Sequence, residues 1–254
     1  MTSLGFEEAR QRVGTLAISA MLASAGGFLD GFMYVGHGRV FANSMTGNVV
    51  LLGINLLSGS WQTALHRLPV IVAFLVGVCV SQVLQLRAKR RDVSAPYSAV
   101  LVLEIVVLVV LSLLPATTAD ILFTISIAFA ASVQVQTFRE VNGHGYSSTF
   151  TTGNLRTLAE AAVDWLHEGR GAAPVVRDFS VICTAFLAGA TAGASTVQAF
   201  GNRALWCDVI VLVLVAIRVR SRMSSPAIVP DIAASVEDRV EESPVSGKGT
   251  ALES

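Results

Sequence analysis

The feature that most constrains this chain is a series of apolar runs, each close to the length needed to cross a lipid bilayer. A membrane-crossing helix needs roughly 17–25 apolar residues, and the six runs of about this length lie at 13–35, 68–86, 97–114, 119–138, 179–200 and 204–219. Charged residues make up only 14% of the chain, whereas a soluble domain carries roughly 25%. The sequence therefore predicts an all-α polytopic membrane protein.

The basic residues predict the orientation of these runs, because Lys and Arg gather in cytoplasmic loops. If six runs cross, most basic residues share one side, namely Arg10, Arg12, the cluster at 87–91, Arg139, Arg156, Arg170, Arg177, Arg218, Arg220 and Arg222. Only Arg39, Arg67 and Arg203 fall on the other side. We therefore expect about six transmembrane helices with both termini in the cytoplasm. The formal net charge is +0, so nothing in the charge indicates a nucleic-acid partner.

Two segments about a hundred residues apart carry the same short motifs. The segment 36–53 reads GHGRVFANSMTGNVVLLG, and the later part of the chain repeats Gly-His-Gly at 143–145 and Thr-Gly-Asn at 152–154. Such a recurrence predicts a duplicated architecture with a short half-helix element in each half. Three crossings per half is an odd number, so the second half should enter the membrane upside down relative to the first.

The chain is accordingly expected to have four parts. Residues 1–12 form a cytoplasmic head, residues 13–115 the first membrane repeat and residues 116–220 the second, inverted repeat. Residues 221–254 are rich in Ser, Pro and Glu and are expected to be a disordered cytoplasmic tail.

The motifs also resemble a known family. The stretch from Asp30 to Gly53, the Phe-Leu-Val-Gly at 74–77 and the apolar run around Glu104 resemble the YoaK-like family of bacterial inner-membrane proteins, a domain of unknown function. The resemblance covers roughly residues 13–220. It implies a six-span protein of the bacterial inner membrane, of a kind sometimes regarded as an exporter of small metabolites. It supplies no catalytic or ligand-binding residues.

The two Thr-Gly-Asn motifs are the first candidate site. They are Thr46, Gly47 and Asn48 in the first half, and Thr152, Gly153 and Asn154 in the second. Thr or Asn can cap a helix start and Gly permits a sharp turn, so the positive end of each half-helix could hold a polar or anionic substrate. The alternative is a structural cap in a loop at the membrane surface.

Three acidic residues in apolar runs, Asp30, Glu104 and Asp208, are the second candidate site. An ionised carboxylate inside a membrane usually pairs, takes up a proton or lines a water path. We expect these residues to couple protons; the alternative is that those near a span end reach the lipid headgroups.

Some further polar residues leave the choice between function and structure open. His37 and His144 could relay protons, or they could be solvated loop residues. Arg156, Glu160 and Asp164 recur every four residues on one helix face, and a lipid-exposed helix cannot carry such a stripe.

Together these features predict a transporter or exporter of a small polar metabolite, coupled to protons. The alternative is a non-transporting membrane scaffold, or a subunit that binds a lipid or a partner. No catalytic or metal-binding motif is present, so neither enzymatic activity nor a cofactor or metal is expected. The expected partners are the lipid bilayer and an unidentified small-molecule substrate; a homo-oligomer is left open.

Overall fold

The computed structural model describes residues 6–91 and 97–224, and most of them are helical. The helices are α1 (Phe6–Val13), α2 (Leu16–Gly36), α3 (Met45–Leu57), α4 (Trp61–Leu65), α5 (Leu68–Arg90), α6 (Tyr97–Ser112), α7 (Asp120–Thr137), α8 (Thr151–Glu168), α9 (Ala173–Phe200) and α10 (Leu205–Ser224). Two short strands, β1 (Glu140–Val141) and β2 (His144–Gly145), form an antiparallel hairpin. The predicted all-α class is confirmed apart from this hairpin.

Four stretches of the described chain are long and apolar enough to cross a membrane by their length and composition. They are Leu16–Gly36, Trp61–Arg90, Asp120–Thr137 and Ala173–Ser224. The last stretch contains two helices, α9 and α10, separated by a short 3₁₀ turn at Gly201–Ala204. Two further apolar helices are shorter, α6 with 16 residues and α3 with 13. The chain is thus a multi-pass membrane protein.

The predicted division into four parts stays a prediction, and the structure adds detail to its head and its tail. The head predicted at 1–12 contains most of helix α1, whose residues Ala9 and Val13 are buried in the main core. The tail predicted from 221 begins later, because α10 continues to Ser224. The remainder of the predicted tail, 225–254, lies outside the described residues.

The helices run back and forth between two ends of the bundle, which we name after one residue of each. At the His37 end, His37 contacts Asp120 at the start of α7 and Asn202 in the 3₁₀ turn. At the Arg10 end, Arg10 forms an ion pair with Glu140 of the hairpin. Among the described residues, the ends of α2, α6 and α9 thus meet at the His37 end, and the end of α7 lies at the Arg10 end.

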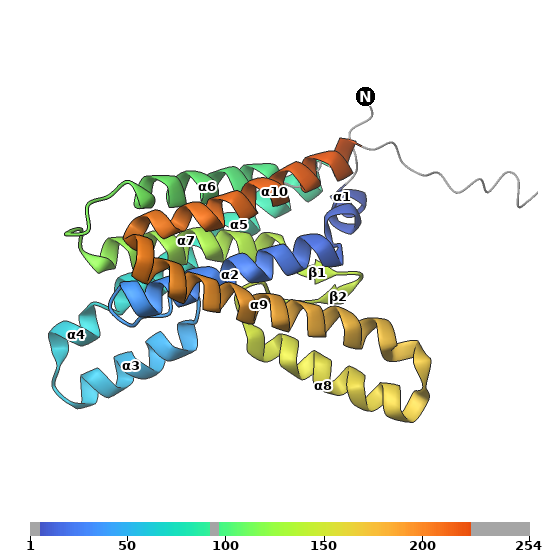
Figure 1. Cartoon of the computed structure of the whole chain (residues 1–254), viewed down its shortest axis with the longest axis horizontal. Helices are drawn as coiled ribbons and strands as arrows, with labels where there is room; N and C mark the ends of the chain where they lie inside the picture. Colours follow the sequence, from blue (N-terminus) through green and yellow to red (C-terminus); the bar gives the residue numbers. More distant parts are fainter. Residues whose placement is uncertain (1–5, 92–96, 225–254) are drawn as a thin grey trace, which may run out of the picture. The chain divides into compact units, whose positions relative to one another are not determined.

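The closest helix pairs join the first half of the chain to the second. Helix α2 packs along α9, and α5 packs along α7 (Figure 1). A Cβ on Gly31 of α2 would collide with the carbonyl of Ala190, and a Cβ on Gly189 or Gly193 of α9 would collide with the backbone of α2. Small residues at such contacts let two helix backbones approach closely, so the glycine pattern fixes this pairing.

Helices α3 and α8 leave the bundle from its middle. Figure 1 shows both starting beneath the central part of α2 and running outward in opposite directions. The loop before α3 is anchored there by the Asn43 side-chain amide, which donates to the Gly26 carbonyl at 3.1 Å. The loop before α8 lies against the same residue, because a Cβ on Gly26 would collide with the Ser148 carbonyl. Gly26 is the midpoint of α2, so loops from both halves reach the middle of one helix.

Candidate functional site

A groove of about 450 Å³ lies between α2, α9 and the loop before α3. Its volume is within the range of roughly 300–1,000 Å³ that is usual for small-molecule sites. Most of the lining is apolar, and the polar exceptions are Asp30, Tyr34, Thr191, Ser195 and Gln198. Of the three predicted acidic residues, Asp30 is the one that lines this groove.

Asp30 is held in place by the loop that follows its own helix. Its side chain is 7% exposed, and one carboxylate oxygen accepts a hydrogen bond from the Asn43 backbone N–H at 3.3 Å. Because Asn43 is also bonded to Gly26, the loop closes against α2 over about one turn of helix. A carboxylate inside an apolar bundle is therefore fixed at the wall of a cavity, which is a common arrangement at binding sites.

The two Thr-Gly-Asn motifs lie in the first turns of α3 and α8, and each asparagine bonds to the loop before its helix. The Asn48 amide donates to the Phe41 carbonyl at 3.1 Å. The Asn154 amide donates to the Ser147 carbonyl at 2.7 Å, and its carbonyl oxygen accepts from the Ser147 N–H at 3.0 Å. The predicted helix capping is wrong, because the residues at the cap positions are Ser44 and Phe150 and neither makes a side-chain cap bond.

The other members of the two motifs make no comparable contacts. Thr46 and Thr152 are exposed, and a Cβ built on Gly47 or Gly153 would meet nothing within 4 Å. Neither glycine has a positive φ, so within the described chain neither close packing nor backbone conformation requires it. The predicted substrate contact of these residues stays a prediction.

Glu104 of α6 and Asp208 of α10 are brought together in the helical core. Each is 1% exposed, and their carboxyl groups are near enough to interact electrostatically. None of their four carboxyl oxygens has a hydrogen-bond partner in the described residues. Apolar side chains of both helices, including Leu101, Leu108 and Leu212, belong to the core around them. The prediction that these acids reach the lipid headgroups is thereby wrong for both residues.

His37 belongs to a network that the sequence did not indicate. Its two ring nitrogens lie 2.8 Å from an Asp120 carboxylate oxygen and 3.1 Å from the Asn202 side-chain oxygen. The ring also stacks on Phe123 of α7, with centroids 4.1 Å apart. His37 is 6% exposed, so the alternative of a solvated loop residue is wrong for His37. His144 is exposed, as that alternative expects.

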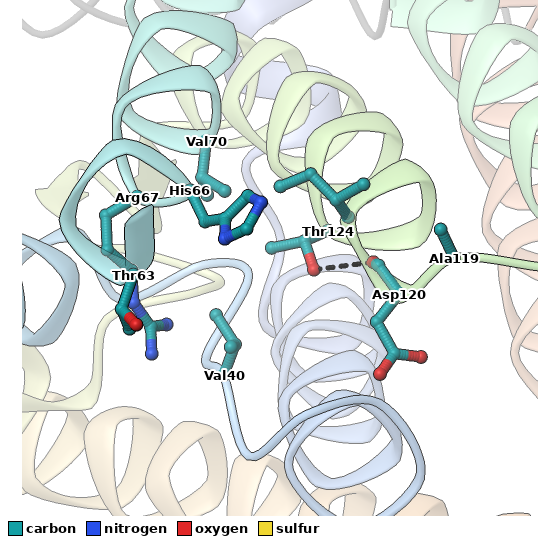
Figure 2. A pocket seen from close by; sticks show the side chains of 9 residues that line it. Val40, Thr63, His66, Arg67, Val70, Ala119, Asp120 and Thr124 are labelled. Carbon is teal, nitrogen blue, oxygen red and sulfur yellow. Dashed lines mark hydrogen bonds between the residues drawn. The ribbon is translucent and has the colours of Figure 1, made fainter. Parts of the chain in front are cut away.

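A second cavity, of about 330 Å³, lies at the His37 end between the start of α5 and the start of α7. Figure 2 shows the His66 imidazole and the Asp120 carboxylate on opposite sides of the cavity. Arg67 lies on the same side as His66. The Thr124 hydroxyl is occupied, because it donates to the Asp120 backbone carbonyl at 2.9 Å. The remaining lining is apolar except for Thr63. The cavity therefore presents both signs of charge, whereas Asp30 is the only charged residue that lines the groove among the described residues.

The polar stripe on α8 is exposed along the helix. Arg156 and Glu160 form an ion pair of 2.8 Å, with side chains 80% and 58% exposed. The helix starts beside the middle of α2, so its first turns lie alongside apolar helices of the bundle. Charges exposed beside apolar helices require water or another polar surface around them.

The architecture and the buried acidic groups define a class, the multi-pass helical membrane proteins. The model of the family described as "Protein of unknown function (DUF1275)" matches residues 18–218. The chain therefore belongs to this family, and the resemblance seen in the sequence is confirmed.

One curated relative extends this result. The chain is similar to the UPF0700 transmembrane protein YoaK of Bacillus subtilis (strain 168), with 27% identity over 144 residues. The match covers 56% of this chain and 64% of the relative, so it leaves about a third of the relative's length unmatched. No solved structure matches the chain.

Proposed function

We propose that this protein is a secondary transporter or exporter of a small polar metabolite in a bacterial inner membrane, built from two inverted repeats of three crossing helices. Helices α2, α5 and α6 are the crossings of the first repeat, and α7, α9 and α10 are those of the second. Helix α2 of the first half packs on α9 of the second, and α5 of the first half packs on α7 of the second. This pattern supports the repeat, because a pseudo-two-fold axis that relates α2 to α7 and α5 to α9 turns one of these pairs into the other.

The observation that carries the proposal is the meeting of two loops, one from each half, at Gly26. Asn43 bonds to Gly26 from one side, and Ser148 packs against it from another. Broken elements that enter from opposite faces and end near the midplane are typical of transporter substrate sites. Irregular backbone at that depth is tolerated where protein or a water-filled cavity surrounds it.

The substrate path in this proposal runs along the groove beside Asp30 and past the first turns of α3 and α8. Thr46, Gly47 and Asn48, with Thr152, Gly153 and Asn154, line its central part. The Arg10 end faces the cytoplasm, because most Lys and Arg residues lie there. Asp30, Glu104 and Asp208 carry the proton coupling, with Glu104 and Asp208 linking α6 to α10.

Two measurements test the proposal. Spin labels at positions 46 and 152, both exposed in the structure, should report depths near the bilayer midplane, whereas position 62 in α4 should report the membrane surface. In cells, deleting or overproducing the protein should change the ratio of internal to external concentration of at least one metabolite. An unchanged metabolite profile together with labels at headgroup depth would favour a non-transporting scaffold or a partner-binding subunit.

A further inference from the structure

The groove beside Asp30 has one sign of charge. Asp30 is its only charged residue, and no Lys, Arg or His lines it among the described residues. A single carboxylate inside an apolar bundle is costly unless a positive charge or a proton compensates it. The groove is thus electrostatically suited to a cation and unsuited to an anion.

Two of the other polar groups of the groove, the hydroxyls of Thr191 and Ser195 on α9, have their hydrogens engaged elsewhere. The Thr191 hydroxyl donates to the Leu187 carbonyl at 2.9 Å, and the Ser195 hydroxyl donates to the Thr191 carbonyl at 2.7 Å. Each hydroxyl has therefore used its single hydrogen and offers only lone pairs to the groove. An ammonium group has three donors and no acceptor, so it matches Asp30 and these two hydroxyl oxygens better than a carboxylate, which has no donor, does.

Three aromatic side chains also line the groove. Tyr34 of α2 and Phe41 of the loop before α3 stack with their centroids 4.9 Å apart and their planes 20° from parallel. Phe186 of α9 also lines the groove. Aromatic faces attract cations and also accommodate an apolar body. The loop that holds Asp30 therefore also supplies one ring of the stack.

We infer that this groove binds a small organic cation, a primary ammonium group carried on an apolar body, with the ammonium at Asp30 and the body against Tyr34 and Phe41. The further statement that this cation is the transported substrate rests on the proposed function. Binding itself can be measured without transport.

The test uses the full chain in lipid nanodiscs and titrates it with 2-phenylethylammonium at pH 7. The uncharged 2-phenylethanol, which has the same apolar body, serves as the comparison probe. The ammonium should bind at least tenfold more tightly than the alcohol. Asp30→Asn should weaken ammonium binding at least tenfold and leave the alcohol unchanged, while Asp164→Asn on exposed α8 should change neither.

A second set of variants protects the test against misfolding of Asp30→Asn. Phe41→Leu should weaken ammonium binding several-fold, whereas Phe200→Leu, an exposed ring outside the groove, should have no effect. Thr191→Val should also weaken it, because the change removes an acceptor at nearly constant volume. Equal binding of ammonium and alcohol, or ammonium binding that none of the groove variants weakens, would overturn the inference.

A flux measurement on the full chain reconstituted into vesicles separates this inference from the proposed function. Saturable binding that depends on Asp30, with no flux of radiolabelled 2-phenylethylammonium or any other metabolite, would uphold the cation site and remove the transporter. Flux of other metabolites with no ammonium binding would remove the cation site and leave the transporter standing.

Discussion

The three buried acidic residues have different surroundings. Asp30 accepts a backbone hydrogen bond and opens onto a groove, so a ligand can reach it. Glu104 and Asp208 are buried among apolar side chains, near enough to interact electrostatically and without hydrogen-bond partners in the described residues. Two interacting buried carboxyl groups cannot both be ionised at low cost. The pair therefore stays a candidate for proton coupling.

Glu104→Gln tests this task, because it keeps the side-chain size and removes the titratable carboxyl group. The variant should insert and fold normally, since neither carboxyl oxygen of Glu104 has a hydrogen bond to lose. If the pair couples protons, transport by the variant should lose its dependence on pH. Flux measured in reconstituted vesicles from pH 5.5 to 8.5 checks this, with the exposed Glu160→Gln as the matched control. A pH profile identical to that of the unchanged protein would exclude Glu104 from the coupling.

The neighbouring residues Gly153 and Asn154 should respond in opposite ways to replacement by alanine. Asn154→Ala removes two hydrogen bonds to Ser147 and should lower the free energy of unfolding by about 1–3 kcal/mol. Gly153→Ala should leave it unchanged or raise it, because the added Cβ meets nothing and alanine favours a helix. Thermal unfolding in detergent measures both. Equal destabilisation by the two changes would show that the asparagine does not secure the loop.

A larger side chain at Gly153 tests function rather than folding. Gly153→Val and Gly47→Val should leave insertion and abundance nearly unchanged, because a Cβ at either position would meet no other part of the described protein within 4 Å. If the substrate passes these first turns, both variants should nonetheless abolish transport. Retained flux in both would move the path away from the Thr-Gly-Asn motifs.

At the scale of the elements, the close contact of α2 with α9 depends on glycine. Gly189 lies so near the Ser24 backbone that a Cβ would collide with it. Gly189→Val should therefore cost more than the usual 1–3 kcal/mol of core overpacking, because helix backbone cannot shift as a side chain can. Gly53→Val in α3, which has open space around it, is the matched control. Thermal unfolding that shows similar stability for both variants would contradict this account of the pairing.

The sequence predicted the positions of the helices far better than it predicted the contacts between them. Apolar length is a local property, so the expected runs 119–138 and 68–86 coincide closely with α7 and α5. The role of Asn48 could not be predicted, because capping and bonding to a preceding loop require the same residue type. The burial of His37 depends on α7 and the 3₁₀ turn arriving at the same place, and its flanking glycines indicate only a loop.

The groove shows the same division between local and distant information. Asp30 was a candidate because a carboxylate in an apolar run is unusual wherever it lies. Phe41 and Gln198 were not candidates, because the groove that both residues line exists only once α9 packs on α2. A stripe of Thr191, Ser195 and Gln198 on one helix face was the signal that could have indicated a polar groove.

At the scale of the whole molecule, the orientation of the chain is the testable quantity. A cysteine at position 89, in an otherwise cysteine-free protein, should be labelled only from the cytoplasm, because it lies in the basic cluster at the end of α5. A cysteine at position 62 in α4 should be labelled from the opposite side. Membrane-impermeant maleimide applied to intact cells and to inverted vesicles distinguishes the two. Labelling of position 89 from outside intact cells would rule out the six-crossing arrangement.

The pairing of α2 with α9 also determines when this protein can complete its fold during biosynthesis. Helix α2 ends at Gly36, but its partner α9 begins at Ala173. At synthesis rates of about 5–20 residues per second, the glycine face of α2 remains without its partner in the membrane for on the order of ten seconds. During that interval the loop anchor at Gly26 can form on only one side. Assembly is thus delayed until α9 has been synthesised, and a truncated first half would leave its most tightly packing surface open to other proteins of the membrane.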